Sequence, residues 1–216
     1  MQNAPLTPIL SALALCMGTW GAAVGTAWAQ TPSQPAPSTA SASDSSATAP
    51  QVVAHYAHLV HTSYSDTLTA AKAMQTAINA FTAQPSAATL AEARKTWLAA
   101  REFYGQTEAF RFYGGPIDND NGPEGRINAW PMDESFVDSV QGKASAGLVN
   151  NRKFVINKKN LSAQNERGGE ENIATGWHAI EFFLWGQDVS DTGPGERSFE
   201  DFVDGKAPTP TAAAST

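Results

Sequence analysis

Apolar residues recur at spacings of three and four along the first long segment after the N-terminal region. Because one helical turn takes 3.6 residues, they form one stripe on a helix of about eight turns. Pro85 then breaks the chain, and Ser86 can cap a second helix that runs to Gly114. Two long helices joined by a short turn pack antiparallel. The stripe consists of Val53, Tyr56, Ala57, Val60, Tyr64, Leu68, Ala71, Met74, Ile78 and Phe81.

The second helix carries both aromatic and ionisable residues on one stripe. Trp97, Arg101, Tyr104 and Glu108 recur at spacings of four, three and four, so we expect them to face the core. Helical bundles build metal sites by converging such groups from facing helices. The alternative is that Arg101 and Glu108 form a half-solvated pair within their own helix.

Residues 114–142 are rich in Gly, Pro, Asn and Asp, which predicts a long ordered loop with a short helix after Pro131. Ile127 and Trp130 are expected to pin this loop to the body of the domain. No segment alternates in the manner of a strand. The predicted fold class is therefore all-α, an antiparallel helical bundle.

The most apolar run of the chain, GWHAIEFFLWGQD, lies in a last helix predicted from Glu170 to Trp185. His178 and Glu181 are neighbours on one face of it, at i and i+3. No side of the helix is strongly polar, so we expect it to be buried nearly all round. A buried carboxylate needs a partner or a proton. The two residues therefore either satisfy each other or take part in a site.

Both ends of the chain differ in composition from the folded part. The uncharged apolar leader ends in Ala27-Trp28-Ala29, the pattern that signal peptidase reads, so we expect export and a mature start at Gln30. Two tracts rich in Pro, Ser, Ala and Thr cannot bury enough apolar surface to fold. The expected segments are a signal peptide (1–29), a disordered linker (30–50), a helical domain (51–205) and a disordered tail (206–216).

Composition narrows the function classes. The chain of 216 residues, 16% of them charged, suits one globular domain with no membrane span after signal cleavage. Its net charge is −7 and its basic residues do not cluster, which excludes nucleic acid as a partner. The only cysteine, Cys16, lies in the leader. The mature protein thus has no thiol for a disulfide or a thiolate metal site.

Three blocks, in the same order, resemble the imelysin family. They are TWLAAREFYGQTEAFRFYGGPID, INAWPMDESFVD and ENIATGWHAIEFFLWGQD, the last containing Gly176-x-His178-x-x-Glu181. The resemblance covers nearly all of residues 52–205. It implies an envelope protein of the bacterial periplasm or outer membrane, iron-regulated in many members and classed with metallopeptidases. The implied fold is two helical bundles related by duplication, and family members continue well beyond the signature helix. We therefore expect this chain to contain only the N-terminal bundle and the signature helix, and to be C-terminally truncated relative to the family.

The interpretation that we favour is a metal-binding protein of iron uptake or homeostasis. A nitrogen and oxygen ligand set without thiols suits a divalent metal, iron more than zinc. The expected partners are this metal, a small anionic ligand beside Arg101, and other iron-uptake components of the envelope. The candidate ligands are His178, Glu181 and Glu108, and the candidate supporting residues are Gly176, Arg101, Trp130 and Asp133.

Two alternatives stay open. A metal-dependent envelope peptidase needs a metal with an open position, a water and a general base. The HExxH arrangement of zinc peptidases is absent, and no spare base is evident if Glu108 is a ligand. The second alternative is a non-catalytic fragment in which His178 and Glu181 form only a structural pair. Asp118-Asn119-Asp120-Asn121 could also help to gather cations.

Overall fold

The computed structural model describes residues 46–205, and this part of the chain is helical without a β-strand, which confirms the predicted all-α class. The predicted signal peptide, the linker as far as residue 45 and the tail lie outside the described residues. The α-helices are α1 (Ala49–Ala83), α2 (Ala87–Thr107), α3 (Glu124–Ile127), α4 (Glu134–Val137), α5 (Lys158–Gln164) and α6 (Gly176–Trp185). The 3-10 helices are η1 (Glu108–Phe110), η2 (Leu148–Asn150) and η3 (Phe199–Phe202).

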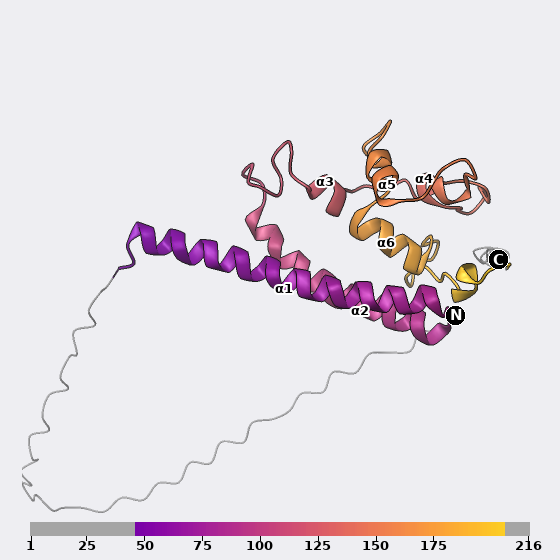
Figure 1. Ribbon diagram of the computed structural model, residues 1–216, viewed down its shortest axis with the longest axis horizontal. Coiled ribbons are helices and arrows are strands. Elements are labelled where there is room, and N and C mark those ends of the chain that lie inside the picture. Colours follow the sequence, from indigo (N-terminus) through magenta and orange to yellow (C-terminus); the bar gives the residue numbers. More distant parts are fainter. Residues whose placement is uncertain (1–45, 206–216) are drawn as a thin grey trace, which may run out of the picture. The chain divides into compact units, whose positions relative to one another are not determined.

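Helices α1 and α2 form the predicted antiparallel hairpin and lie side by side (Figure 1). The turn between them is closed by a capping box at Ser86. Its hydroxyl accepts from the Thr89 backbone N–H at 3.2 Å, and the Thr89 hydroxyl accepts from the Ser86 backbone N–H at 3.1 Å. The sequence therefore encodes the start of α2 locally. Helix α1 begins two residues before the predicted domain boundary at residue 51.

The apolar stripe of α1 is buried only in its second half, although it continues along the whole helix. Met74 and Phe81 are 6% and 1% exposed, whereas Val53 is 67% and Leu68 55% exposed. The cause is a mismatch of length. With 35 residues α1 is about 52 Å long, while the 21 residues of α2 cover about 31 Å.

The hydrophobic core lies where α1, α2 and α6 meet. Helix α2 contributes its predicted aromatics, with Trp97 5% and Tyr104 3% exposed. The Phe81 ring of α1 meets the Phe202 ring of η3 with centroids 4.7 Å apart. The buried members of the core are Met74, Phe81, Leu90, Ala93, Trp97, Ala100, Tyr104, Trp177 and Leu184.

Two helices are shorter than their sequence patterns predict. Helix α2 ends at Thr107 and not near Gly114, and the 3-10 helix η1 follows it. Beyond η1, Phe112 takes a φ of 70° and donates its backbone N–H to the Asp118 carboxylate, so no helix continues to Gly114. Helix α6 begins at Gly176 and not at Glu170. The Asn165 side-chain oxygen accepts the backbone N–H groups of residues 174 and 175 at 3.0 and 3.2 Å, which holds that segment outside the helix.

The long loop between α2 and α6 is ordered by short helices. The helix predicted after Pro131 is α4, and the Asp133 carboxylate caps it by accepting from the Ser135 backbone N–H at 2.9 Å. Helix α3 was not predicted. Ile127 packs against the core as expected, but Trp130 is 68% exposed and does not enter it. None of the described helices is long and apolar enough to cross a membrane.

Candidate functional site

His178 and Glu181 contact each other on α6, as their spacing predicts. The imidazole Nδ1 lies 3.0 Å from the Glu181 carboxylate oxygen Oε2. An i, i+3 pair of this kind fixes both side chains on one helical face. In the structure the histidine is therefore oriented by a carboxylate one turn farther along the helix.

This pair lies at the edge of the core and not inside it, which corrects the prediction of a buried site. The side chains of His178 and Glu181 are 16% and 43% exposed. Helix α6 itself is buried nearly all round, as predicted, because Trp177 faces the core shared with α2 and Phe182 is buried on another side of the helix. Because the Glu181 carboxylate keeps contact with solvent, its charge does not require a buried counterion.

Gly176 allows the start of α6 to approach the end of α3. Its φ is +90°, and a Cβ at this position would lie 2.3 Å from the Ile127 carbonyl oxygen and 2.9 Å from that of Arg126. The adjacent Thr175 hydroxyl donates to the same Arg126 carbonyl at 2.9 Å. No larger residue fits here without moving the backbone, so the glycine sets where the His–Glu face begins.

Two side chains of helix α2 hold α6 in place by donating hydrogen bonds to backbone carbonyl groups of α6. Arg94 donates from Nε to the Leu184 carbonyl at 2.9 Å, and the Trp97 indole donates to the Trp177 carbonyl at 3.2 Å. Cations are favourable at a helix C-terminus, where the last carbonyls lack partners within the helix. Burial lowers the pKa of Arg94 from its usual value, and Glu196 opposes this effect.

Trp130 and Asp133, both predicted as supporting residues, lie in different surroundings. The Trp130 ring lies against His178, with ring centroids 4.7 Å apart at 53°. Asp133 caps α4, and its backbone N–H donates to the Glu171 carbonyl at 2.7 Å. Trp130 thus contacts the candidate site directly, whereas Asp133 belongs to the loop that leads away from it.

Glu108, the third predicted ligand, binds other residues in the structure. Its Oε1 accepts from Arg111 Nη1 at 3.1 Å and from Asn128 Nδ2 at 3.1 Å. Arg111 also reaches Glu124 at 2.8 Å. Among residues 46–205 no three His, Cys, Asp or Glu side chains are gathered in a group that could hold a metal ion. A three-residue ligand set that includes Glu108 therefore stays a prediction.

Arg101 does not form the pair with Glu108 that was considered as an alternative. Its guanidinium carbon lies 5.1 Å from the Tyr104 ring centroid and 5.9 Å from that of Trp177. In the described part of the chain no carboxylate lies within ion-pair distance of it. One side of Arg101 lines a shallow hollow of about 400 Å³, together with Glu102, Gly105, Gln106 and Glu108.

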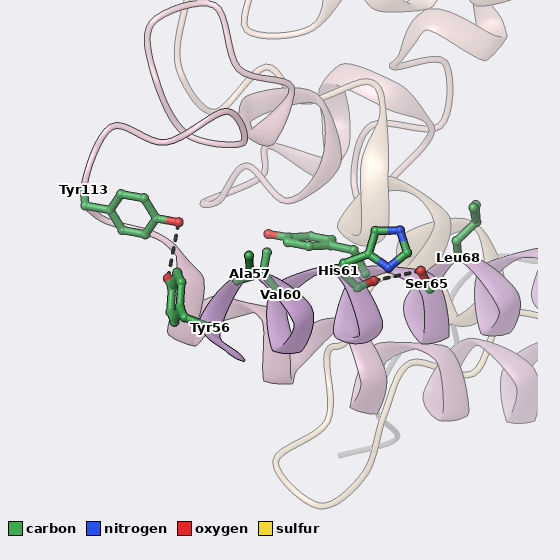
Figure 2. Close-up of a pocket in the computed structure, with 8 residues that line it drawn as sticks. Tyr56, Ala57, Val60, His61, Ser65, Leu68 and Tyr113 are labelled. Carbon is green, nitrogen blue, oxygen red and sulfur yellow. Dashed lines mark hydrogen bonds between the residues drawn. The ribbon is translucent and has the colours of Figure 1, made fainter. Parts of the chain in front are cut away.

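A second hollow, of about 560 Å³, lies on the exposed half of α1 and was not predicted as a site (Figure 2). Figure 2 shows the hydroxyl groups of Tyr56 and Tyr113 facing each other, 3.4 Å apart. This hydrogen bond is the main cause that raises the pKa of Tyr113 to about 12. The lining residues are Tyr56, Ala57, Val60, His61, Tyr64, Ser65, Leu68 and Tyr113.

The acidic loop considered for gathering cations is engaged in its own turns. The Asp118 carboxylate accepts the backbone N–H groups of Phe112 and, at 3.0 Å, of Gly115. The Asn119 side-chain oxygen accepts the Asn121 N–H at 2.9 Å. Such local bonds are the usual role of Asp and Asn in turns, and they engage Asp118 and Asn119 in the structure of the loop itself.

Comparison with known proteins bears on these sites. The family model described as Imelysin matches residues 60–216. This chain belongs to the imelysin family. The imelysin match includes α2, α6 and the His178–Glu181 pair.

The chain is also similar to Iron-regulated protein A of Synechococcus elongatus, with which it shares 37% identity over 71 residues. The aligned region covers 33% of this imelysin chain and 19% of that protein, so the similarity spans about a fifth of the relative's length.

Four residues that contact Arg101 or Glu108 in the imelysin chain were not predicted as site residues from the sequence. Tyr104 and Trp177 flank its guanidinium, and Arg111 and Asn128 hold Glu108. A signal was available for Tyr104, which shares the helical stripe of Arg101 and Glu108. None existed for Asn128, which a loop of irregular conformation brings into place.

Proposed function

We propose that this imelysin-family protein is exported and binds iron, or another divalent metal, at His178 and Glu181 in iron uptake or homeostasis of the cell envelope. The observation that supports this most is the half-exposed pair itself. A carboxylate holds one imidazole nitrogen 3.0 Å away at a surface that a cation can reach. The name of the Synechococcus relative, Iron-regulated protein A, supports the link to iron.

The pair has the chemistry of a metal ligand. When Nδ1 of a neutral imidazole donates to a carboxylate, Nε2 presents its lone pair outward. Within residues 46–205, His178 Nε2 has no hydrogen-bond partner. In this arrangement His178 Nε2 would be the nitrogen ligand, and Glu181 would supply an oxygen ligand only after exchanging its bond with Nδ1. Such a nitrogen and oxygen donor set, with no thiolate nearby, suits iron by type.

Further residues enter the proposal with separate roles. Glu108 would be a third ligand only after exchanging its bonds with Arg111 and Asn128. Gly176 sets the start of α6, and Trp130 shields one face of the imidazole. The leader that ends in Ala27-Trp28-Ala29 supports a periplasmic or outer-membrane location, where other iron-uptake components are the expected partners.

A metal-dependent peptidase is the second candidate, because the family name classes imelysins as peptidases. Peptide hydrolysis would require a water and a general base beside the metal. Glu181 could act as that base only if it were not a metal ligand and exchanged its bond with His178 Nδ1. A protease assay with and without a chelator distinguishes the two candidates, since a binding protein shows no cleavage in either condition.

The test measures iron and zinc binding by isothermal titration calorimetry on protein purified without a metal-affinity tag. We expect His178→Ala and Glu181→Ala each to abolish binding and Glu108→Gln to weaken it. His61→Ala removes an exposed histidine of α1 and should leave the affinity unchanged. Equal affinity in the wild type and in the His178→Ala/Glu181→Ala double variant would refute the proposal and leave a structural pair.

A further inference from the structure

Five buried polar atoms near the contacts of α2 with α3 and α6 lack hydrogen-bond partners. Buried polar groups in folded proteins are nearly always bonded, so such a group of unpaired atoms needs an explanation. Two of the residues are almost fully buried, Tyr104 being 3% and Trp177 5% exposed. The atoms are Arg101 Nη1, Tyr104 Oη, Arg111 Nε, Asn128 Oδ1 and Trp177 Nε1.

Three of these residues contact one another directly. The Tyr104 and Trp177 ring centroids are 5.3 Å apart, and the Arg101 guanidinium lies over both rings, 5.1 and 5.9 Å from their centroids. Arg111 and Asn128 are joined to each other through Glu108. The side chains of Arg101, Tyr104 and Trp177, each of which carries an unpaired polar atom, thus form one cluster.

The cluster has an excess of donors. Arg101 Nη1, Arg111 Nε and Trp177 Nε1 can only donate, and the Asn128 oxygen is the one unpaired atom that can only accept. Burial first, and then Glu124, raises the pKa of Tyr104 to about 12, against the opposing effect of Arg111 and Arg101. The Tyr104 hydroxyl therefore keeps its proton and is available as a fourth donor.

Within residues 46–205, Arg101 is the one cation of the cluster without an ion pair of its own. Glu108 and Glu124 neutralise Arg111 at 3.1 and 2.8 Å. Arg101 lies over two aromatic rings and has no ion pair among the described residues. A group that satisfies the unpaired donors must bring acceptor atoms, and an anionic group would also give Arg101 the ion pair that it lacks.

We propose that Arg101, Tyr104 and Trp177 form a binding site for a carboxylate group or a small oxyanion. A guanidinium matches two oxygens of such a group, and the phenol and indole add neutral donors in a largely dry setting. Arg101 connects the buried donors to the hollow of about 400 Å³ on α2. Glu108, which also lines this hollow, is held by Arg111 and Asn128.

This site does not depend on the proposed metal. The same chemistry is offered by free bicarbonate, by an organic dicarboxylate such as oxalate, and by the C-terminal carboxylate of a peptide. Titrations with sodium bicarbonate, sodium oxalate, and a tripeptide with either a free or an amidated C-terminus separate these sources. All are performed without metal, so a failure of metal binding does not affect the outcome.

The experiment follows the tryptophan indole N–H signals of the full chain in ¹H–¹⁵N spectra, with sodium chloride at equal ionic strength as the blank. We expect the Trp177 signal, assigned from Trp177→Phe, to shift and to saturate with at least one of the probes. The indole signal of Trp130, an exposed residue, should stay in place. Loss of the shift on amidation would identify the peptide carboxylate as the ligand.

Variants test which residues bind the anion. Arg101→Gln should reduce the affinity about tenfold or more, because it removes a charged donor. Lys95→Gln removes an exposed cation of the same helix and should leave the affinity unchanged. Tyr104→Phe, which keeps the ring and deletes the donor, should weaken binding even if Arg101→Gln misfolds, and His178→Ala should retain it.

Two results would overturn the inference. One is the absence of a saturable Trp177 shift with every probe up to about 100 mM, which would mean that buried water satisfies the donors. The other is an affinity in Tyr104→Phe and folded Arg101→Gln equal to that of the wild type.

Discussion

Replacing Gly176 by alanine tests how α6 is positioned. The glycine has a φ of +90°, and an added Cβ would lie 2.3 Å from the Ile127 carbonyl oxygen and 2.7 Å from the Ile127 carbonyl carbon. These contacts are with the backbone of α3, which cannot rotate away as a side chain can. The substitution must therefore shift α6 or α3, or both.

Two costs add in this variant. A left-handed backbone costs a residue with a Cβ about 1–2 kcal/mol. Overpacking against a fixed neighbour costs about 1–3 kcal/mol more. We expect Gly176→Ala to lower the free energy of unfolding by about 2–5 kcal/mol, which for a domain of this size lowers the melting temperature by roughly 5–15 °C.

Urea unfolding followed by circular dichroism at the helical band measures this change. Gly142→Ala is a matched control, because Gly142 has a φ of +78° but nothing lies within 4 Å of its Cβ position. Gly142→Ala should therefore lose only the free energy that a left-handed backbone costs a residue with a Cβ. If the two variants lose the same stability, the close approach of α3 to α6 does not constrain the site and our reasoning is wrong.

Three further predictions concern the rest of the domain. Arg197→Gln should lower the free energy of unfolding by about 3–5 kcal/mol in the same urea assay. It breaks the 2.7 Å pair with Asp138, whose side chain is only 11% exposed. Phe81→Ala, at a side chain 1% exposed, should cost about 3–5 kcal/mol through the cavity that it leaves, measured by thermal unfolding. Burial raises the pKa of Glu134, so its charged form is disfavoured in the folded state and wild-type stability should fall as pH rises through that pKa. Glu134→Gln should remove this fall, and parallel pH profiles of unfolding for the two proteins would contradict the prediction.

The hairpin of α1 and α2 and the pairing on α6 could be predicted because both depend on local signals in the sequence. The apolar spacing of α1, the Ser86 cap and Pro85 together specify a helical hairpin. The pairing of His178 with Glu181 follows from their i, i+3 separation on one helix. Each of these features is decided within a few residues of sequence, which is where pattern reasoning is strongest.

What could not be predicted depends on partners that are distant in the sequence. The exposure of Val53 follows from the length of α2, not from the residues around Val53. Glu181 is 43% exposed because the surrounding elements leave its position on α6 partly uncovered, although they bury Phe182 one residue farther along. Glu108 binds Asn128, 20 residues away across an irregular loop. The periodicity of the sequence shows on which face of a helix a residue lies. It does not show whether another element of the fold covers that face.

Helix α2 holds α6 through main-chain contacts. The stability of the domain therefore does not depend on which residues occupy the candidate site. Arg94 and Trp97 bind carbonyl oxygens of the α6 main chain, which any sequence in that helix would provide. Positions 178 and 181 can therefore vary while the helix keeps its place. A library randomised at these two positions should yield mostly folded proteins, so selection could act on ligand preference without first having to restore the fold.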